Sequence, residues 1–216
     1  MAEFYLKDVY SKDFYNQLAE VLKKHSPSFN KKKFLSLIFD GQHQNRELKE
    51  RMHHAAATLN KALTGSYQKK ISILKPTAAE FKNGLTGLIF PDFVEMFGTN
   101  EADYDTSIDA LAHFTQFSSS EFAIRPFIIK YPKKTMAQLL KWASHENYHI
   151  RRLASEGCRS RLPWAMALPE FKKNPAPILP ILELLKADKM DYVYRSVANN
   201  LNDISKDHPD LALELA

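Results

Sequence analysis

One stretch of the sequence, HENYHIRRLASEGCRSRLPW from His145 to Trp164, carries residues for two kinds of chemistry. Its first five letters fit the H-E-x-x-H pattern of zinc peptidases, in which two histidines bind the metal and the glutamate acts as a base. The residues that follow hold one acid, Glu156, and four arginines: Arg151, Arg152, Arg159 and Arg161. The planar guanidinium suits bidentate contacts with phosphate. The stretch could therefore bind a metal or a polyanion.

A zinc peptidase requires both histidines on one helix face and a third ligand from elsewhere. The internal repeat places a helix boundary between His145 and His149. No third histidine follows at the spacing of the longer H-E-x-x-H-x-x-G-x-x-H motif, so Glu170 is a candidate third ligand only by default. Cys158 has no patterned histidine partner, and there is no G-x-x-x-x-G-K-[ST] or G-x-G-x-x-G motif. We therefore expect no metal and no cofactor.

The elements that must position these residues are helices. Apolar residues recur at helical spacing almost throughout, as in Phe14, Leu18, Val21 and Leu22. Prolines interrupt much of the chain and cut it into short pieces. The sequence predicts an all-α protein made of short, paired helices.

An internal repeat refines this prediction. LKWASHENYHIRRLA, from Leu140 to Ala154, aligns with LLKADKMDYVYRSVA, from Leu184 to Ala198, at an offset of 44 residues. This period is typical of HEAT-like and armadillo-type repeats, which stack into a solenoid with a concave face. In both copies a turn should precede the tyrosine, so Asn147 and Asp191 should lie near the start of a helix that carries the arginines.

Composition limits the remaining possibilities. The chain has 216 residues, a net charge of +5 and one cysteine, so acidic partners are favoured and an internal disulfide is excluded. It lacks a secretory signal and any run of roughly 18 apolar residues that could span a membrane. We expect a cytoplasmic protein without membrane contact. We also expect a single domain over 1–216, with N-terminal helices over 1–100 and more regular repeats over 101–216.

Several longer stretches of the sequence resemble those of a known protein family. The most specific are SEFAIRPFI, HIRRLASEGCRSRLPW and YVYRSVANNLNDISKDHPD, and the likeness extends upstream to FDGQHQNRELKERMHHAAATLNKAL and SIDALAHFTQFSS. Together they resemble the AlkC branch of the bacterial DNA alkylation-repair glycosylases, which are related to the AlkD group and built of HEAT-like repeats. Ser160 stands where the family pattern usually has proline, and Tyr194 where it has arginine.

The resemblance implies a DNA glycosylase that acts in base excision repair of alkylation damage. It would hydrolyse the N-glycosidic bond of cationic bases of the 3-methyladenine and 3-methylcytosine type in double-stranded DNA. The departing base is neutral, so a strong general acid is unnecessary. Fixed negative charge beside the developing oxocarbenium ion, and an acceptor that positions water, would supply the catalysis. No cofactor is implied, and a monomer is expected.

The resemblance also implies the site residues. Glu121, expected to open a helix, and Glu156 would supply the carboxylates, and Trp164, after a helix-starting Pro163, would form an aromatic wall. The phosphate contacts would come from six residues: Arg152, Arg159, Arg161, Arg195, Asn199 and Asn200. On local evidence alone, Glu121 could be a first-turn acid and Glu156 a salt-bridge partner of Arg152.

Other residues receive weaker interpretations. Arg151, equivalent to Arg195 in the repeat, could brace the adjacent repeat, and Asp203 is a third carboxylate candidate or a capping acid. The basic run Lys31 to Lys33 could touch DNA or only water.

The alternative is a non-catalytic helical-repeat scaffold that binds DNA or an acidic partner. Glutamates tied up in ion pairs would favour that scaffold, and carboxylates converging on a basic groove would favour the enzyme. Relatives commonly continue through further helices, and sometimes an immunoglobulin-like domain, beyond the position where this chain ends.

Overall fold

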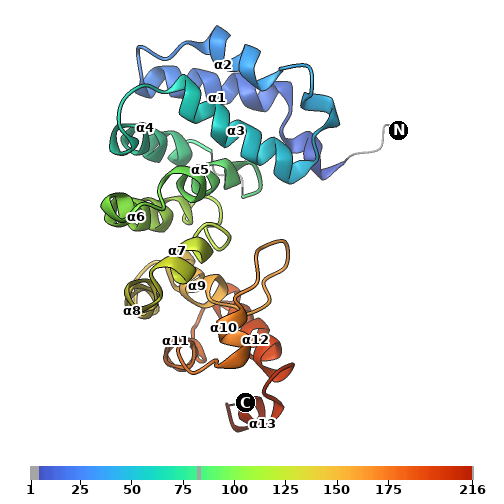
Figure 1. Ribbon diagram of the computed structural model, residues 1–216, viewed down its shortest axis with the longest axis vertical. Coiled ribbons are helices and arrows are strands. Elements are labelled where there is room, and N and C mark those ends of the chain that lie inside the picture. Colours follow the sequence, from blue (N-terminus) through green and yellow to red (C-terminus); the bar gives the residue numbers. More distant parts are fainter. Residues whose placement is uncertain (1–4, 82–83, 216) are drawn as a thin grey trace. The chain divides into compact units, whose positions relative to one another are not determined.

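The computed structural model describes residues 5–81 and 84–215, and within these ranges it contains helices and no strand (Figure 1). The predicted all-α, helical-repeat fold is confirmed. The chain divides into two compact units, Met1–Ser119 and Ser120–Ala216. The expected single domain and the expected concave basic face both stay predictions.

Over residues 5–81 and 84–119, the first unit contains six α-helices: α1 (Lys12–His25), α2 (Lys31–Ile38), α3 (Leu48–Ala62), α4 (Tyr67–Ala79), α5 (Ile89–Phe97) and α6 (Tyr104–Phe114). Side chains of Ser11, Asn30 and Ser66 cap the starts of α1, α2 and α4 by accepting backbone N–H bonds. The predicted apolar face of α1 buries Phe14, Leu18 and Leu22 against α2 and α4. The basic run Lys31 to Lys33 forms the first turn of α2, where Lys31 pairs with Glu20.

The second unit contains the repeat and all the candidate site residues. Its helices are α7 (Arg125–Lys130), α8 (Pro132–Trp142), α9 (Tyr148–Gly157), α10 (Pro169–Lys173), α11 (Leu179–Leu185), α12 (Asp191–Ser205) and α13 (Pro209–Leu215). The aligned strings correspond to the pairs α8/α9 and α11/α12, and α9 packs along α12 (Figure 1). This packing brings arginines from one repeat against polar side chains from the next.

Two details of the repeat confirm the predicted helix starts. Asn147 caps α9 by accepting the backbone N–H of His149, and Asp191 is the first residue of α12. Arg151 donates two bonds, of 2.6 and 3.0 Å, to the carboxylate of Asp188. Since Asp188 lies in the turn between α11 and α12, Arg151 braces one repeat against the next. Trp142 is buried, as expected for a core residue.

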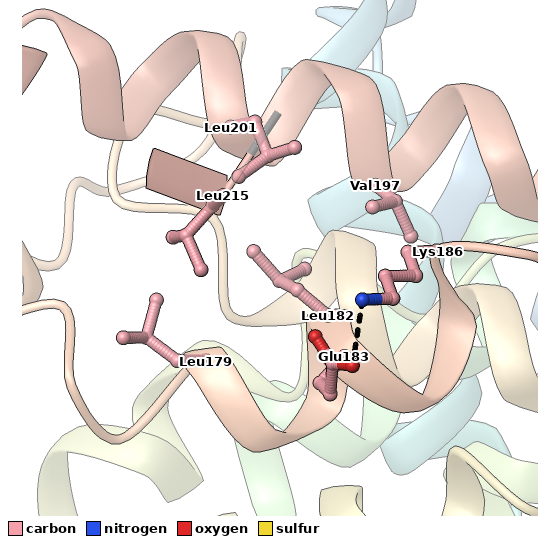
Figure 2. A pocket seen from close by; sticks show the side chains of 7 residues that line it. All are labelled: Leu179, Leu182, Glu183, Lys186, Val197, Leu201 and Leu215. Atoms are coloured by element: carbon pink, nitrogen blue, oxygen red, sulfur yellow. Dashed lines mark ion pairs between the residues drawn. The ribbon is translucent and has the colours of Figure 1, made fainter. Parts of the chain in front are cut away.

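An apolar pocket of the second unit lies between α11, α12 and α13 (Figure 2). Leucine and valine side chains from all three helices face one another across it, and the ion pair Glu183–Lys186 lies on its edge. None of its lining residues belongs to the candidate site. In the described part of the chain, no helix is both long and apolar enough to cross a membrane.

Candidate active site

The two glutamates singled out in the sequence converge on one guanidinium. Glu121 lies in the turn just before α7, four residues ahead of the position where the helix begins, and Glu156 lies in the last turn of α9. Arg152, one turn earlier on α9, donates from Nη1 to Glu121 Oε2 at 2.9 Å. Its Nη2 lies 3.6 Å from Glu156 Oε1. Both carboxylates are buried, so helix packing places two acids beside one cation.

A second set of buried polar contacts fixes Glu156. Arg159 Nη1 donates to Glu156 Oε1 at 2.6 Å, and Ser196 Oγ on α12 donates to Glu156 Oε2 at 2.6 Å. Arg159 Nε also donates to Asp203 Oδ2 at 2.8 Å. Asp203 is 1% exposed and is a buried ion-pair acid, not a helix cap. Both oxygens of Glu156 are therefore held in place.

The electrostatics of the two glutamates differ. Burial raises the pKa of the Glu121 carboxyl above its ordinary value of 4.5, although Arg152 opposes the shift, and the charge of Glu156 adds to it. Burial by itself would lower the pKa of Arg152, but Glu121 and Glu156 outweigh that effect and raise it. Arg152 therefore stays charged, and Glu121 is a carboxylate that takes up a proton readily.

An aromatic cluster borders this site and was not anticipated from the sequence. The guanidinium carbon of Arg152 lies 4.8 Å from the ring centroid of Tyr192, a cation–π contact. Tyr148 and His149 pack edge-on against the same ring, with centroids 6.4 and 6.0 Å away. The signal was present in the repeat alignment, where Tyr148 and Tyr192 occupy the same position. Tyr192 is 44% exposed, so it offers an aromatic surface next to the carboxylates.

Trp164 lies in the loop between α9 and α10 and is 60% exposed. Its φ of 65° is in the left-handed region, the one such case among the described non-glycine residues. The prediction that Pro163 starts a helix is wrong, since both residues belong to a turn. A bulky residue in this conformation is strained, and such strain is concentrated at functional sites.

Comparison with known proteins points to a family. No family model matches the chain. It is 47% identical over 211 residues to the uncharacterized protein YhaZ of Bacillus subtilis (strain 168), an alignment that covers 98% of the chain and 58% of that relative. A solved structure, alkylpurine DNA glycosylase AlkC of Pseudomonas fluorescens bound to DNA containing an abasic site analog, matches 98% of the chain with a TM-score of 0.93 and 36% identity. Over nearly its whole length the chain is therefore similar to an AlkC glycosylase. It spans 58% of the length of both proteins.

Of the six residues predicted to contact phosphate, Arg152 lies in the carboxylate cluster described above, and the other five fall into two groups. Arg195 and Asn199 are exposed on α12, and Arg161 is partly exposed beside Asp207. Asn200 is fully buried and donates to the carbonyl oxygen of Ser155 at 2.9 Å, and Arg159 is 8% exposed in its double ion pair. Because these last two residues offer almost no polar surface to a phosphate, we leave them out of the DNA-binding proposal.

The histidines of the peptidase pattern do not share a helix. His145 lies before the start of α9, and its Nδ1 accepts a hydrogen bond from the backbone N–H of Asn147. His149 lies in the first turn of α9. The predicted helix boundary between them is confirmed. Across the described ranges, no group of three or more His, Cys, Asp or Glu side chains is placed to hold a metal ion. The geometry that a zinc peptidase needs is therefore not met at this motif.

Proposed function

We propose that this AlkC-like chain is a DNA glycosylase that removes N-alkylated, cationic bases from double-stranded DNA in base excision repair. The observation that carries the proposal is the convergence of Glu121 and Glu156, from separate segments, on Arg152. The likeness to a DNA-bound alkylpurine glycosylase supports it. Bases of the 3-methyladenine and 3-methylcytosine type are the proposed substrates.

The chemistry follows from the charge of the substrate. An alkylated ring nitrogen makes the base a cation, and the base becomes neutral as the N-glycosidic bond breaks and positive charge moves to the sugar. A fixed negative charge beside the sugar stabilises this transition state. Glu156, held by Arg159 and Ser196, is suited to that role because its position cannot relax.

Glu121 is suited to position the attacking water. Its raised pKa makes its carboxylate a better proton acceptor than an ordinary glutamate. It also receives a hydrogen bond from Arg152, which keeps one oxygen oriented. In this assignment Glu121 takes the water proton, and Glu156 stabilises the oxocarbenium ion.

Aromatic surfaces would contact the lesion. Trp164 is exposed, and its face would lie against the deoxyribose or the cationic base, which a ring quadrupole attracts. The strained backbone of Trp164 supports a functional reason for its conformation. Tyr192, which stacks against Arg152, offers a second aromatic surface beside the carboxylates.

Phosphates would be held by Arg161, Arg195 and Asn199, which set the register of the protein on DNA without reading sequence. The ion pair of Arg195 with Asp191 is exposed at both ends and therefore weak enough for a phosphate to replace it. A monomeric, cytoplasmic protein is part of the same proposal.

A scaffold without activity would also tolerate ion-paired glutamates, and both glutamates do pair with arginine. The likeness over nearly the whole chain to a glycosylase favours the enzyme. Two duplex substrates separate the two functions. The enzyme should release 3-methyladenine from methylated duplex and no uracil from uracil-containing duplex. Release of uracil, or no release of either base, would contradict the proposal.

A further inference from the structure

Arg125, the first residue of α7, is fully buried and binds backbone oxygen atoms instead of a carboxylate partner. Its Nη1 donates to the carbonyl oxygens of Gly157 at 3.0 Å and Arg159 at 2.8 Å. Its Nε donates to the carbonyl oxygen of Met166 at 2.6 Å. One side chain therefore joins the end of α9 to a point further along the loop that leads to α10.

This burial is costly. A buried cation without a directly bonded carboxylate loses hydration that carbonyl dipoles replace only in part. Burial accordingly lowers the pKa of the Arg125 guanidinium to about 10, and its Nη2 is buried without a hydrogen-bond partner within the described residues. The three hydrogen bonds to loop carbonyl oxygens are therefore the feature that needs an explanation.

The loop that Arg125 holds is the one that carries Trp164. Its base is closed by the backbone bond from Leu168 N–H to the Ser160 carbonyl oxygen at 3.1 Å. Arg125 spans the same base, because Arg159 precedes Ser160 and Met166 lies two residues before Leu168. Trp164 projects from the middle of the closed loop.

Gly157 gives an independent sign of the same contact. A Cβ added at Gly157 would lie 2.6 Å from Cγ2 of Ile124, the residue before Arg125. Only glycine allows the end of α9 to approach this closely. The approach places the Gly157 carbonyl oxygen within reach of the Arg125 guanidinium.

We propose that Arg125 is a positioning residue for Trp164, and that its three hydrogen bonds to the loop hold the tryptophan backbone in its left-handed conformation. The importance of this for catalysis rests on the proposed function, in which Trp164 contacts the lesion. Without the guanidinium the loop can relax, and Trp164 then samples other orientations. Small displacements of a positioned group cost up to about a hundredfold in rate.

The test uses Trp164 as its own reporter. A Trp142→Phe background leaves Trp164 as the one tryptophan in the 216-residue chain. In that background, Arg125→Met should lower the fluorescence anisotropy of Trp164 and change its quenching by acrylamide, with no DNA present. Arg151→Met is the matched control, since Arg151 also bonds two carbonyl oxygens, those of His145 and Glu146, but on a different turn. It should leave the Trp164 signal unchanged.

Kinetics complete the test. On methylated duplex DNA, Arg125→Met should lower kcat by roughly ten- to a hundredfold with little change in the Kd for DNA. Arg125→Lys, which keeps a charge and some donors, should recover part of the loss.

Unchanged Trp164 anisotropy and unchanged kcat in a folded Arg125→Met protein would overturn the proposal. If that variant does not fold, the same two results in Arg125→Lys would overturn it. A wild type that releases no base would refute the proposed function, and the fluorescence comparison would still decide whether Arg125 positions Trp164.

Discussion

At the scale of single residues, the environment of Glu121 sets an expected pH dependence. Burial raises its pKa above 4.5, and a water-positioning carboxylate works only when ionised. The rate of base release should therefore be highest at higher pH. It should fall as the pH drops through a midpoint above 4.5. Single-turnover rates on methylated duplex would measure this midpoint. In Glu121→Gln this inflection should disappear, and a wild-type midpoint at or below 4.5 would count against the role of Glu121.

The strain at Trp164 can be measured by comparing two substitutions. Trp164→Gly and Trp164→Ala both remove the exposed ring, but only glycine is unstrained at a φ of 65°. The glycine variant should be more stable than the alanine variant by about 1 kcal/mol in urea unfolding. Both should release base more slowly than wild type. An alanine variant more stable than the glycine variant would contradict strain at this position.

Some of these residue properties follow from the sequence and others do not. The bracing role of Arg151 and the burial of Trp142 could be predicted, because each follows from its position in a helical repeat. The contact between Glu121 and Arg152 could not, because the two residues are separated by 31 positions and helix packing brings them together. The left-handed backbone of Trp164 depends on the whole loop around it.

At the scale of the helices, buried charge ties α12 to the end of α9 and to the residues just after it. Asp203→Ala would leave Arg159 buried with one of its two acids missing, and should destabilise the protein by about 3–5 kcal/mol. Asp191→Ala on the same helix removes an exposed pair with Arg195 and should cost at most about 1 kcal/mol. Urea unfolding of both variants measures the difference. A similar small loss in both would mean that the buried pair contributes little.

Helix starts were the most predictable feature at this scale. Asn147 caps α9 as expected, and the offset of the repeat located α12, because both signals are local. Pro163 does not start a helix, and the loop that carries it is bonded across its base by Arg125, a residue 38 positions earlier. Local propensity cannot report a contact of that length.

At the scale of the whole molecule, the net charge of +5 should make DNA binding depend on salt. Arg195 is exposed, and its ion pair with Asp191 does not involve the buried carboxylates. Arg195→Gln should weaken binding to all duplexes alike and lower the slope of log K against log salt by about 1. Fluorescence anisotropy of labelled duplex measures the slope. Arg151→Gln serves as control, and an equal change of slope in both variants would argue against a specific phosphate contact.

The all-α class and the AlkC likeness were both predictable from the sequence. The class followed from helical periodicity and proline spacing, and the likeness from long strings such as RRLASEG and SVANNLNDISKDHPD. The division into two compact units was not predicted, because the composition of the sequence does not change clearly at position 119.

The most direct measurement is release of free base from methylated duplex DNA in the presence of EDTA, by wild type, Glu121→Gln and Glu156→Gln. We expect release by the wild type that EDTA does not affect. It should fall by about a hundredfold or more in each variant, with DNA binding retained. A wild type that binds DNA and releases no base, or variants that match the wild-type rate, would contradict the assignment of these two glutamates as the catalytic carboxylates of a glycosylase.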